Sequence, residues 1–199
     1  MELSLWEQPV TYGAIGATQA PDLLRHPPEG FRASERRRRI GHGAERWQFA
    51  WLETMSWGIK KGSGFRVRPV DAPAGVLHGD SEYGPDGSQL VRPGDSAVLL
   101  LGWGRLSRSE PVRVVYVVAE PRRRGFAYGT LAGHPLHGEE LFTVQWRDDN
   151  SVWIAIRSFS RPSNRWWWAM YPLLRLAREL FLRRYLRALA GPMTATAPR

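Results

Sequence analysis

Residues 112–162 constrain the fold of this chain more than any other segment. Short runs of β-branched and aromatic residues alternate there with turn residues, a pattern typical of strands joined by short loops. The segment predicts about four strands, and the turn Asp148-Asp149-Asn150 predicts that the last two form a hairpin. The predicted strands cover residues 113–118, 125–131, 139–146 and 152–159.

A long segment without glycine, residues 164–189, follows the strands and is predicted to be helical. One face of this helix is apolar, and most of its arginines, at positions 175, 178, 183, 184 and 187, fall on the opposite side. Pro172 either kinks the helix or marks its first turn. The apolar face comprises Trp167, Tyr171, Leu174, Ala177, Phe181 and Tyr185.

The N-terminal half predicts fewer and weaker elements. Trp47, Trp51 and Met55 recur every four residues and predict a helix over residues 44–57. The charged residues 34–39 suggest the start of another helix, and the proline-rich residues 20–30 predict a loop. Irregular connections are expected between residues 72 and 94, because glycine and proline are frequent there. Further strands are predicted at residues 10–17, 65–70 and, as a fully buried strand, 96–103.

This order of elements predicts an α+β fold in which a curved antiparallel sheet packs around a long C-terminal helix, as in the helix-grip architecture. Such an arrangement leaves space for a cavity between sheet and helix. Residues 1–192 are expected to form one domain and residues 193–199 a disordered tail.

Composition limits the chemistry. The chain has no cysteine, and its five histidines lack metal-ligand spacing, so we expect neither a metal site nor a cofactor. The N-terminus has no signal-peptide pattern, and arginines interrupt the most apolar long window, so a cytoplasmic protein without a membrane span is expected. The net charge of +9 comes almost wholly from arginine and indicates either a solvated basic surface or attraction to anionic partners.

Several runs resemble the domain of unknown function nineteen-ninety family. The similarity is densest in Arg113-Val114-Val115-Tyr116, in residues 125–131, in Gly133-His134-Pro135, in Gly138-Glu139-Glu140 and in Phe159-Ser160-Arg161-Pro162. The resemblance implies a shared ancestry and fold. It transfers no catalytic residues, since none is assigned in that family.

His134 lies in a predicted turn, and Glu139 or Glu140 begins the strand that follows. If either carboxylate reaches the imidazole, it orients the ring and raises its basicity, which would make a general base. Glu140 shares an apolar strand face and therefore needs a cationic partner, for which Arg113, Arg157 and Arg161 are the candidates. The residues predicted to contact a ligand are Tyr116, Tyr128, His134, Glu140 and Arg161.

Three functions remain open from the sequence. The first is binding of a small apolar or amphipathic molecule in a cavity between the sheet and the C-terminal helix. The second is an enzyme of unknown reaction that uses His134 and Glu140 for proton transfer. The third is a basic protein that associates with membranes or nucleic acid. Nucleic acid is not expected, since the tryptophans lie in apolar segments, whereas Trp166, Trp167 and Trp168 beside Arg165 suit peripheral membrane contact. The sequence leaves the oligomeric state unknown.

Overall fold

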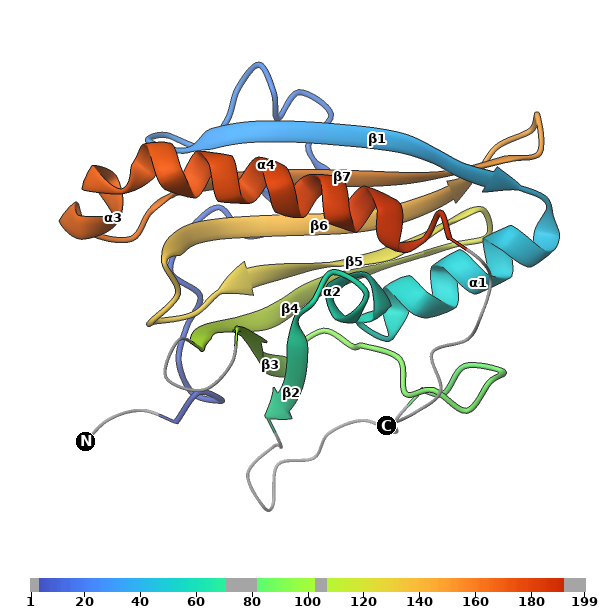
Figure 1. The fold of residues 1–199 in the computed structure, drawn as a ribbon, viewed down its shortest axis with the longest axis horizontal. Helices are drawn as coiled ribbons and strands as arrows, with labels where there is room; N and C mark the ends of the chain where they lie inside the picture. The colour runs from blue at the N-terminus through green and yellow to red at the C-terminus, as the bar shows by residue number, and fades with distance from the viewer. Residues whose placement is uncertain (1–3, 71–81, 103–106, 192–199) are drawn as a thin grey trace.

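The computed structural model describes residues 4–70, 82–102 and 107–191. Within these residues seven strands form one antiparallel sheet in the order β1-β7-β6-β5-β4-β3-β2. The sheet curves, and its concave face is covered by helices (Figure 1). The strands are β1 (Arg32–His42), β2 (Arg66–Val70), β3 (Ser96–Leu101), β4 (Arg108–Glu120), β5 (Arg123–Thr130), β6 (Leu136–Trp146) and β7 (Ser151–Pro162).

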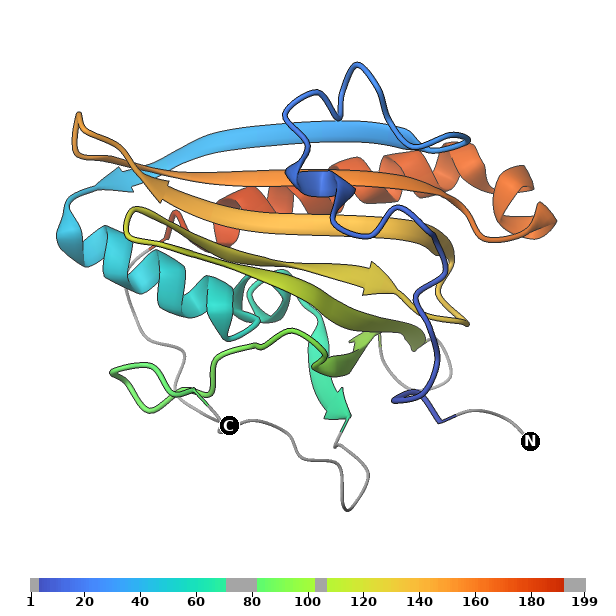
Figure 2. The same cartoon turned by 180° about the vertical axis from the view of Figure 1, so that it is seen from behind.

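In the described part of the chain four helices lie on the concave side, and α4 runs alongside β1 and β7. The N-terminal segment, with the short 3-10 helix η1 (Ala17–Gln19), lies on the opposite, convex side (Figure 2). The four helices are α1 (Ala44–Met55), α2 (Gly58–Lys61), α3 (Arg165–Ala169) and α4 (Tyr171–Ala188). The architecture is the predicted one, a curved sheet gripping a C-terminal helix.

The four predicted strands of residues 112–162 are confirmed as β4 to β7, and the helix predicted over residues 44–57 is confirmed as α1. The C-terminal helix is divided at Met170. Pro172 lies in the first turn of α4, where a backbone N–H would have no partner within the helix, so proline costs no hydrogen bond there. Of the five arginines predicted to face away from the sheet, Arg178 instead points inward and donates to Ser34 Oγ and Ser158 Oγ. The predicted tail, Trp103 and residues 72–81 lie outside the described residues.

Two N-terminal predictions are wrong. Residues 34–39 belong to strand β1 and not to a helix, because backbone pairing with β7 holds them extended while the arginine side chains reach solvent. Residues 10–17 form turns and not a strand. Their backbone follows the convex face of the sheet, and only Thr11 bonds to a strand backbone, through the carbonyl of Thr130.

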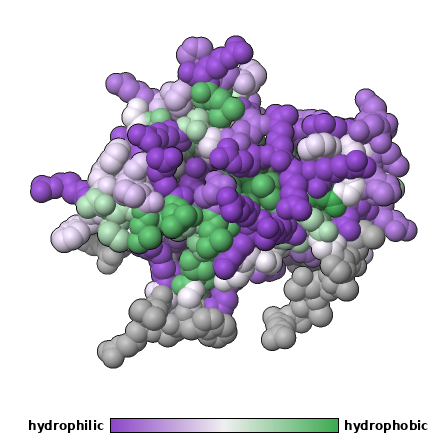
Figure 3. All heavy atoms as spheres, turned by 45° about the horizontal axis from the view of Figure 1, so that its top comes forward, coloured by the Kyte–Doolittle hydropathy of each residue, from purple (hydrophilic) through white to green (hydrophobic). Residues whose placement is uncertain are grey.

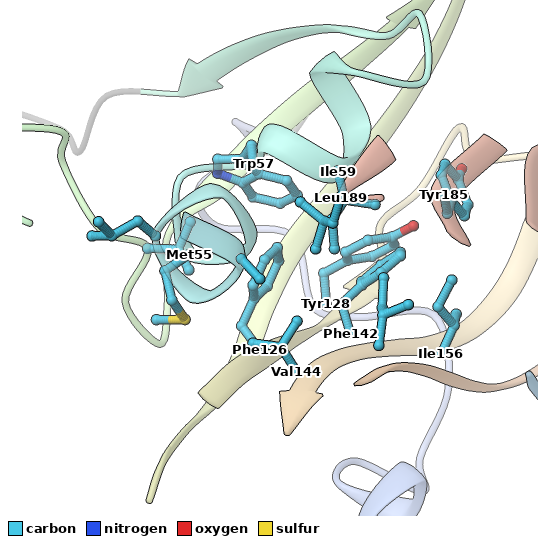
Figure 4. Close-up of a cluster of buried hydrophobic side chains, with 14 of the residues drawn as sticks. Met55, Trp57, Ile59, Phe126, Tyr128, Phe142, Val144, Ile156, Tyr185 and Leu189 are labelled. Atoms are coloured by element: carbon cyan, nitrogen blue, oxygen red, sulfur yellow. The ribbon is translucent and has the colours of Figure 1, made fainter. Parts of the chain in front are cut away.

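The main core fills the space between the concave face and helices α1, α2 and α4. Phe126 and Phe142 are almost fully buried side chains of β5 and β6, and Trp57 packs edge-on against Phe126 with ring centroids 4.8 Å apart. Tyr185 of α4 meets Phe142 in the same way at 5.5 Å. Figure 4 shows these aromatic side chains occupying the layer between sheet and helices. The interior is therefore largely a filled aromatic core.

Glu139 holds the N-terminal segment on the convex face. It is 2 % exposed, and its carboxylate accepts hydrogen bonds from Tyr12 Oη at 2.8 Å, Gly16 N at 2.8 Å and Thr18 N at 3.0 Å. Thr18 Oγ1 donates to it as well. A buried carboxylate is stable only when its oxygens are satisfied in this way, so this one side chain orders residues 12–18.

Replacing Glu139 with glutamine is expected to lower the free energy of unfolding by about 2 to 3 kcal/mol, because the new amide NH₂ group faces backbone donors and cannot accept from them. Urea denaturation measures the change. The matched control is Glu29→Gln at an exposed position, which should change stability by less than about 0.5 kcal/mol. Equal stability of the two variants would contradict the role given to Glu139.

Candidate functional site

Glu140 points to the concave face, because successive side chains of a strand alternate between faces. It stands opposite Tyr128 of β5 and Ser158 of β7 in the strand register. The hydroxyl of Tyr128 donates to its carboxylate, and the ammonium of Lys60 lies 3.1 Å from Glu140 Oε2. The cationic partner that burial requires is thus Lys60. None of the three arginines expected from the sequence takes that place.

The turn between α1 and α2 directs Lys60 into the interior. Trp57 adopts a left-handed conformation with φ of 65°, which costs a residue other than glycine about 1 kcal/mol. At the next position a Cβ would lie 2.6 Å from the carbonyl oxygen of Glu53, so only glycine is accommodated at Gly58. The Lys60 side chain is 3 % exposed, and its ammonium also donates to the hydroxyl of Tyr185 at 2.7 Å.

Aromatic rings surround the Lys60 ammonium. Its nitrogen lies 4.2 Å from the ring centroid of Tyr185, 4.9 Å from that of Tyr128 and 5.1 Å from those of Phe65 and Phe142. Ring faces attract a cation, and the attraction is larger when water is excluded. The aromatic rings and the Glu140 carboxylate together offset part of the desolvation of this buried charge.

The electrostatic field of the site keeps Glu140 ionised. Burial would raise its pKa, but Lys60, the Tyr128 hydrogen bond and Arg178 outweigh that effect, and the pKa lies below its ordinary value. Burial and the neighbouring Glu140 charge raise the pKa values of both Tyr128 and Tyr185 well above the usual range. Near neutral pH the site therefore contains a carboxylate and two protonated phenols.

His134 lies near this site without touching Glu140. Its Nδ1 is 2.8 Å from the carbonyl oxygen and 3.0 Å from the backbone nitrogen of Leu136, and its Nε2 is 3.8 Å from Glu110 Oε2. The carboxylate in ion-pair distance is thus on β4, and neither Glu139 nor Glu140 takes that position. Burial lowers the pKa of His134 to about 3, so the expectation of raised basicity is wrong. Burial raises the pKa of Glu110.

A small space, here called the inner cavity, adjoins these groups and has a volume of about 50 Å³. Arg178 lies on its wall and donates to Ser34 Oγ at 2.6 Å. The inner cavity is lined by Tyr128, Thr130, His134, Leu136, Gly138, Glu139, Glu140, Ser158, Phe159, Ser160 and Arg178.

A larger depression, here called the groove, runs between β1 and α4 and has a volume of about 730 Å³. Leu136, Ser160 and Arg178 line both the groove and the inner cavity, so the two spaces adjoin. The groove is lined by Leu24, residues 32–36, Leu136, Ser160, Tyr171, Pro172, residues 174–176, Arg178 and Glu179.

Of the five residues predicted to contact a ligand, Tyr128, His134 and Glu140 line the inner cavity, and the other two lie elsewhere. Tyr116 is on the convex side, where its hydroxyl lies 2.5 Å from Thr18 Oγ1. Arg161 covers the ring of Phe31, with its guanidinium carbon 4.7 Å from the centroid.

Sequence reasoning missed Lys60, Glu110 and Arg178 as members of this site, whereas Tyr185 was placed on the helix face that faces the sheet. One signal for Lys60 was present, since it and Lys61 are the only lysines in a chain whose other basic residues are arginines. Within the described residues no three histidine, aspartate or glutamate side chains are placed to hold a metal ion. Nor does any helix in that part of the chain have the length and apolar character to cross a membrane.

The fold and the site define an α+β helix-grip protein with a buried ion pair beneath its C-terminal helix. The chain belongs to the family described as "Domain of unknown function (DUF1990)", whose model matches residues 11–188. A "UPF0548 protein" of Deinococcus radiodurans is 32% identical over 194 residues, which cover 92% of this chain and 87% of that protein. A "UPF0548 protein" of Arabidopsis thaliana is 34% identical over 92 residues, or 43% of this chain and 45% of that protein.

A solved structure supports the fold. The crystal structure of a hypothetical protein from Helicobacter pylori, jhp0584, is similar with a TM-score of 0.54, covering 96% of this chain and 97% of that one. The sequences are 10% identical, so the likeness concerns the fold alone.

Replacing Lys60 with methionine is expected to lower the free energy of unfolding by about 3 to 5 kcal/mol, because Glu140 is left buried without its cation. Adding Glu140→Gln to this variant should restore a large part of the loss, since the unpaired charge disappears. Urea denaturation of the two single variants and the double variant gives the coupling energy. A loss below about 1 kcal/mol for the first variant would contradict a buried ion pair.

Stability should also depend on pH through His134. Its pKa in the folded protein, about 3, lies below the value of 6.5 for a free histidine, so the unfolded chain binds a proton that the folded protein does not. This contribution is fully present above pH 6.5 and is lost as pH falls towards 3, with a slope of up to about 1.4 kcal/mol per pH unit. Unfolding measured across this range should show a shallower slope for His134→Asn than for the natural chain. Parallel slopes would show that His134 titrates normally.

Proposed function

We propose that the protein binds a small amphipathic molecule, which lies in the groove between β1 and α4 and places its polar end at the inner cavity. The observation that carries this proposal is the junction of the two spaces at Arg178, beside the buried Glu140 and Tyr128. Ligand sites are typically concave, of about 300 to 1,000 Å³, with a few placed polar groups. The groove falls in this range, and the inner cavity supplies the polar groups.

The filled core favours an amphipathic ligand over a wholly apolar one. Phe126, Phe142 and Tyr185 occupy the apolar centre of the layer between sheet and helices. The inner cavity of about 50 Å³ accepts only a small group, and Tyr128, Glu140 and Arg178 place polar atoms in its wall. The rest of a ligand therefore lies in the groove, where Leu24, Leu174 and Tyr171 supply apolar surface.

The charges of the groove favour a neutral or anionic ligand. Arg32, Arg36, Arg175 and Arg178 line it. Its two acidic residues, Glu35 and Glu179, are already paired with arginines. An anionic group entering the groove therefore meets uncompensated positive charge, which both attracts and orients it.

A catalytic role is the second candidate, favoured by the hydrogen bond between Tyr128 and the ionised Glu140. Efficient proton transfer needs a group whose pKa lies near the working pH. The pKa of His134 is lowered to about 3 by burial, while burial raises the pKa of Tyr128. Both pKa values are thus shifted away from neutral pH, so the site is better suited to binding than to acid–base chemistry.

Native mass spectrometry of the freshly purified protein tests the proposal, followed by solvent extraction to identify any molecule that it retains. If the protein is isolated empty, titration with a fluorescent anionic amphiphile gives its affinity. Replacement of Arg178 with glutamine should weaken that affinity about ten- to a hundredfold, as for loss of a charged hydrogen bond.

The matched control is Arg68→Gln, an exposed arginine of β2 at the sheet edge opposite β1, which should bind as the natural chain does. Equal affinity of both variants, with their folding intact, would contradict binding at this site. Turnover of a bound molecule that is abolished by Glu140→Gln, with ligand affinity retained, would favour the catalytic candidate.

A further inference from the structure

The outward face of α3 and α4 is an exposed apolar surface. Trp166 is 81 % exposed, Leu176 is 69 % exposed and Leu173 is 56 % exposed. Folded proteins keep contiguous apolar patches small unless something binds them. The residues of this surface, here called the apolar stripe, are Trp166, Trp168, Met170, Leu173, Leu176 and Leu180.

Arginines frame the apolar stripe. Arg183, Arg184 and Arg187 are exposed and continue the helix beyond it, and Arg165 and Arg175 flank it. The only acidic residue in α3 and α4, Glu179, is already engaged by Arg36 and Arg183, each at 3.5 Å. The surface therefore combines exposed apolar side chains with a large excess of positive charge.

Strand β1 extends the positive region. It lies beside α4 at the sheet edge, and Arg36 and Arg38, which alternate onto the side that α4 covers, are both exposed. Figure 3 shows apolar side chains of this face surrounded by hydrophilic ones. The positive charge thus comes from two neighbouring elements and is not confined to one helix.

We propose that this face binds the surface of an anionic lipid bilayer, with the apolar stripe inserted among the lipid chains and the arginines at the headgroups. Interfacial helices of this kind bury leucine and tryptophan to the level of the acyl boundary, and each nearby arginine adds attraction to anionic lipid. Tryptophan and arginine both suit the headgroup region, since each has an apolar body and a polar end. The charge of the surface complements that of the bilayer.

A second copy of the chain matches this face less well. A symmetric dimer places the same patch of both copies together, so the exposed arginines of one copy would face those of the other. Like charges brought together at an interface cost several kcal/mol. This binding is independent of the ligand proposed for the groove, although Leu176 lies at the edge of both surfaces.

Co-sedimentation with vesicles tests the proposal. Vesicles of phosphatidylcholine alone are compared with vesicles that also contain phosphatidylglycerol. The natural chain should bind the anionic vesicles, and raising the salt from about 0.1 M to about 1 M should reduce binding, because the Debye length falls from about 10 Å to about 3 Å. Binding should fall about fivefold for each of Arg183, Arg184 and Arg187 replaced by glutamine.

The apolar contribution is tested with the double variant Leu173→Asp/Leu180→Asp, whose two positions are exposed and do not line the groove. Its binding to anionic vesicles should fall at least tenfold, with an unchanged melting temperature. The matched control is Ile15→Asp, which replaces a residue 60 % exposed in the N-terminal segment, far from the apolar stripe in sequence, and should bind as the natural chain does.

Three results would overturn the proposal. The first is absence of binding to anionic vesicles at lipid concentrations of about 1 mM, a level at which even a single acyl anchor binds. The second is equal loss of binding in the Leu173→Asp/Leu180→Asp and Ile15→Asp variants. The third is self-association of the natural chain that the double variant abolishes, since the face would then serve as an interface between copies.

Discussion

Lys60 and Glu140 form an ion pair beneath the helices that cover the sheet, and each charge is stable there only because of the other and of the groups around them. Four aromatic rings surround the ammonium, and the hydroxyl of Tyr128 completes the environment of the carboxylate. The participants come from α2, the loop that follows it, β5, β6 and α4, so the pair forms only when these parts are assembled in one register. A shift of β6 by one residue would turn Glu140 to the other face and break its ion pair with Lys60.

Two consecutive carboxylates of β6 thus stabilise opposite faces of the sheet. Glu139 accepts hydrogen bonds from the N-terminal segment on the convex face, and Glu140 pairs with Lys60 on the concave face. The alternation of a strand is sufficient to send the two side chains apart. Gly138 precedes them with φ of 147°, and a Cβ there would lie 2.0 Å from the carbonyl oxygen of Phe159. The close approach of β6 and β7 at this point therefore depends on glycine. Glu139 and Glu140 follow directly after it.

The sequence predicts the strands of residues 112–162 well, because their alternation has the same period as a half-buried sheet. It predicts residues 34–39 badly, because four successive arginines carry no alternation and an edge strand imposes none on them. Tyr128, His134 and Glu140 could be named from their motifs. The partner of Glu140 could not, since Lys60 is 80 residues away and reaches it only through the left-handed turn at Trp57. The periodicity of apolar residues predicts which face of a strand or helix a side chain occupies. The ion-pair partner of a residue distant in sequence depends instead on the tertiary fold.

Strand β1 pairs with β7, so Arg32 lies opposite Ser160 although most of the chain separates the two residues in sequence. During synthesis β1 therefore leaves the ribosome long before its partner exists, and at about 5 to 20 residues per second the delay is about 6 to 25 seconds. An unpaired strand in a nascent chain is open to pairing with neighbouring chains. The arginines of β1 make that strand strongly positive, and two such strands repel one another. The positive charge at one edge of the folded sheet thus also disfavours pairing of β1 with neighbouring chains before β7 has been synthesised.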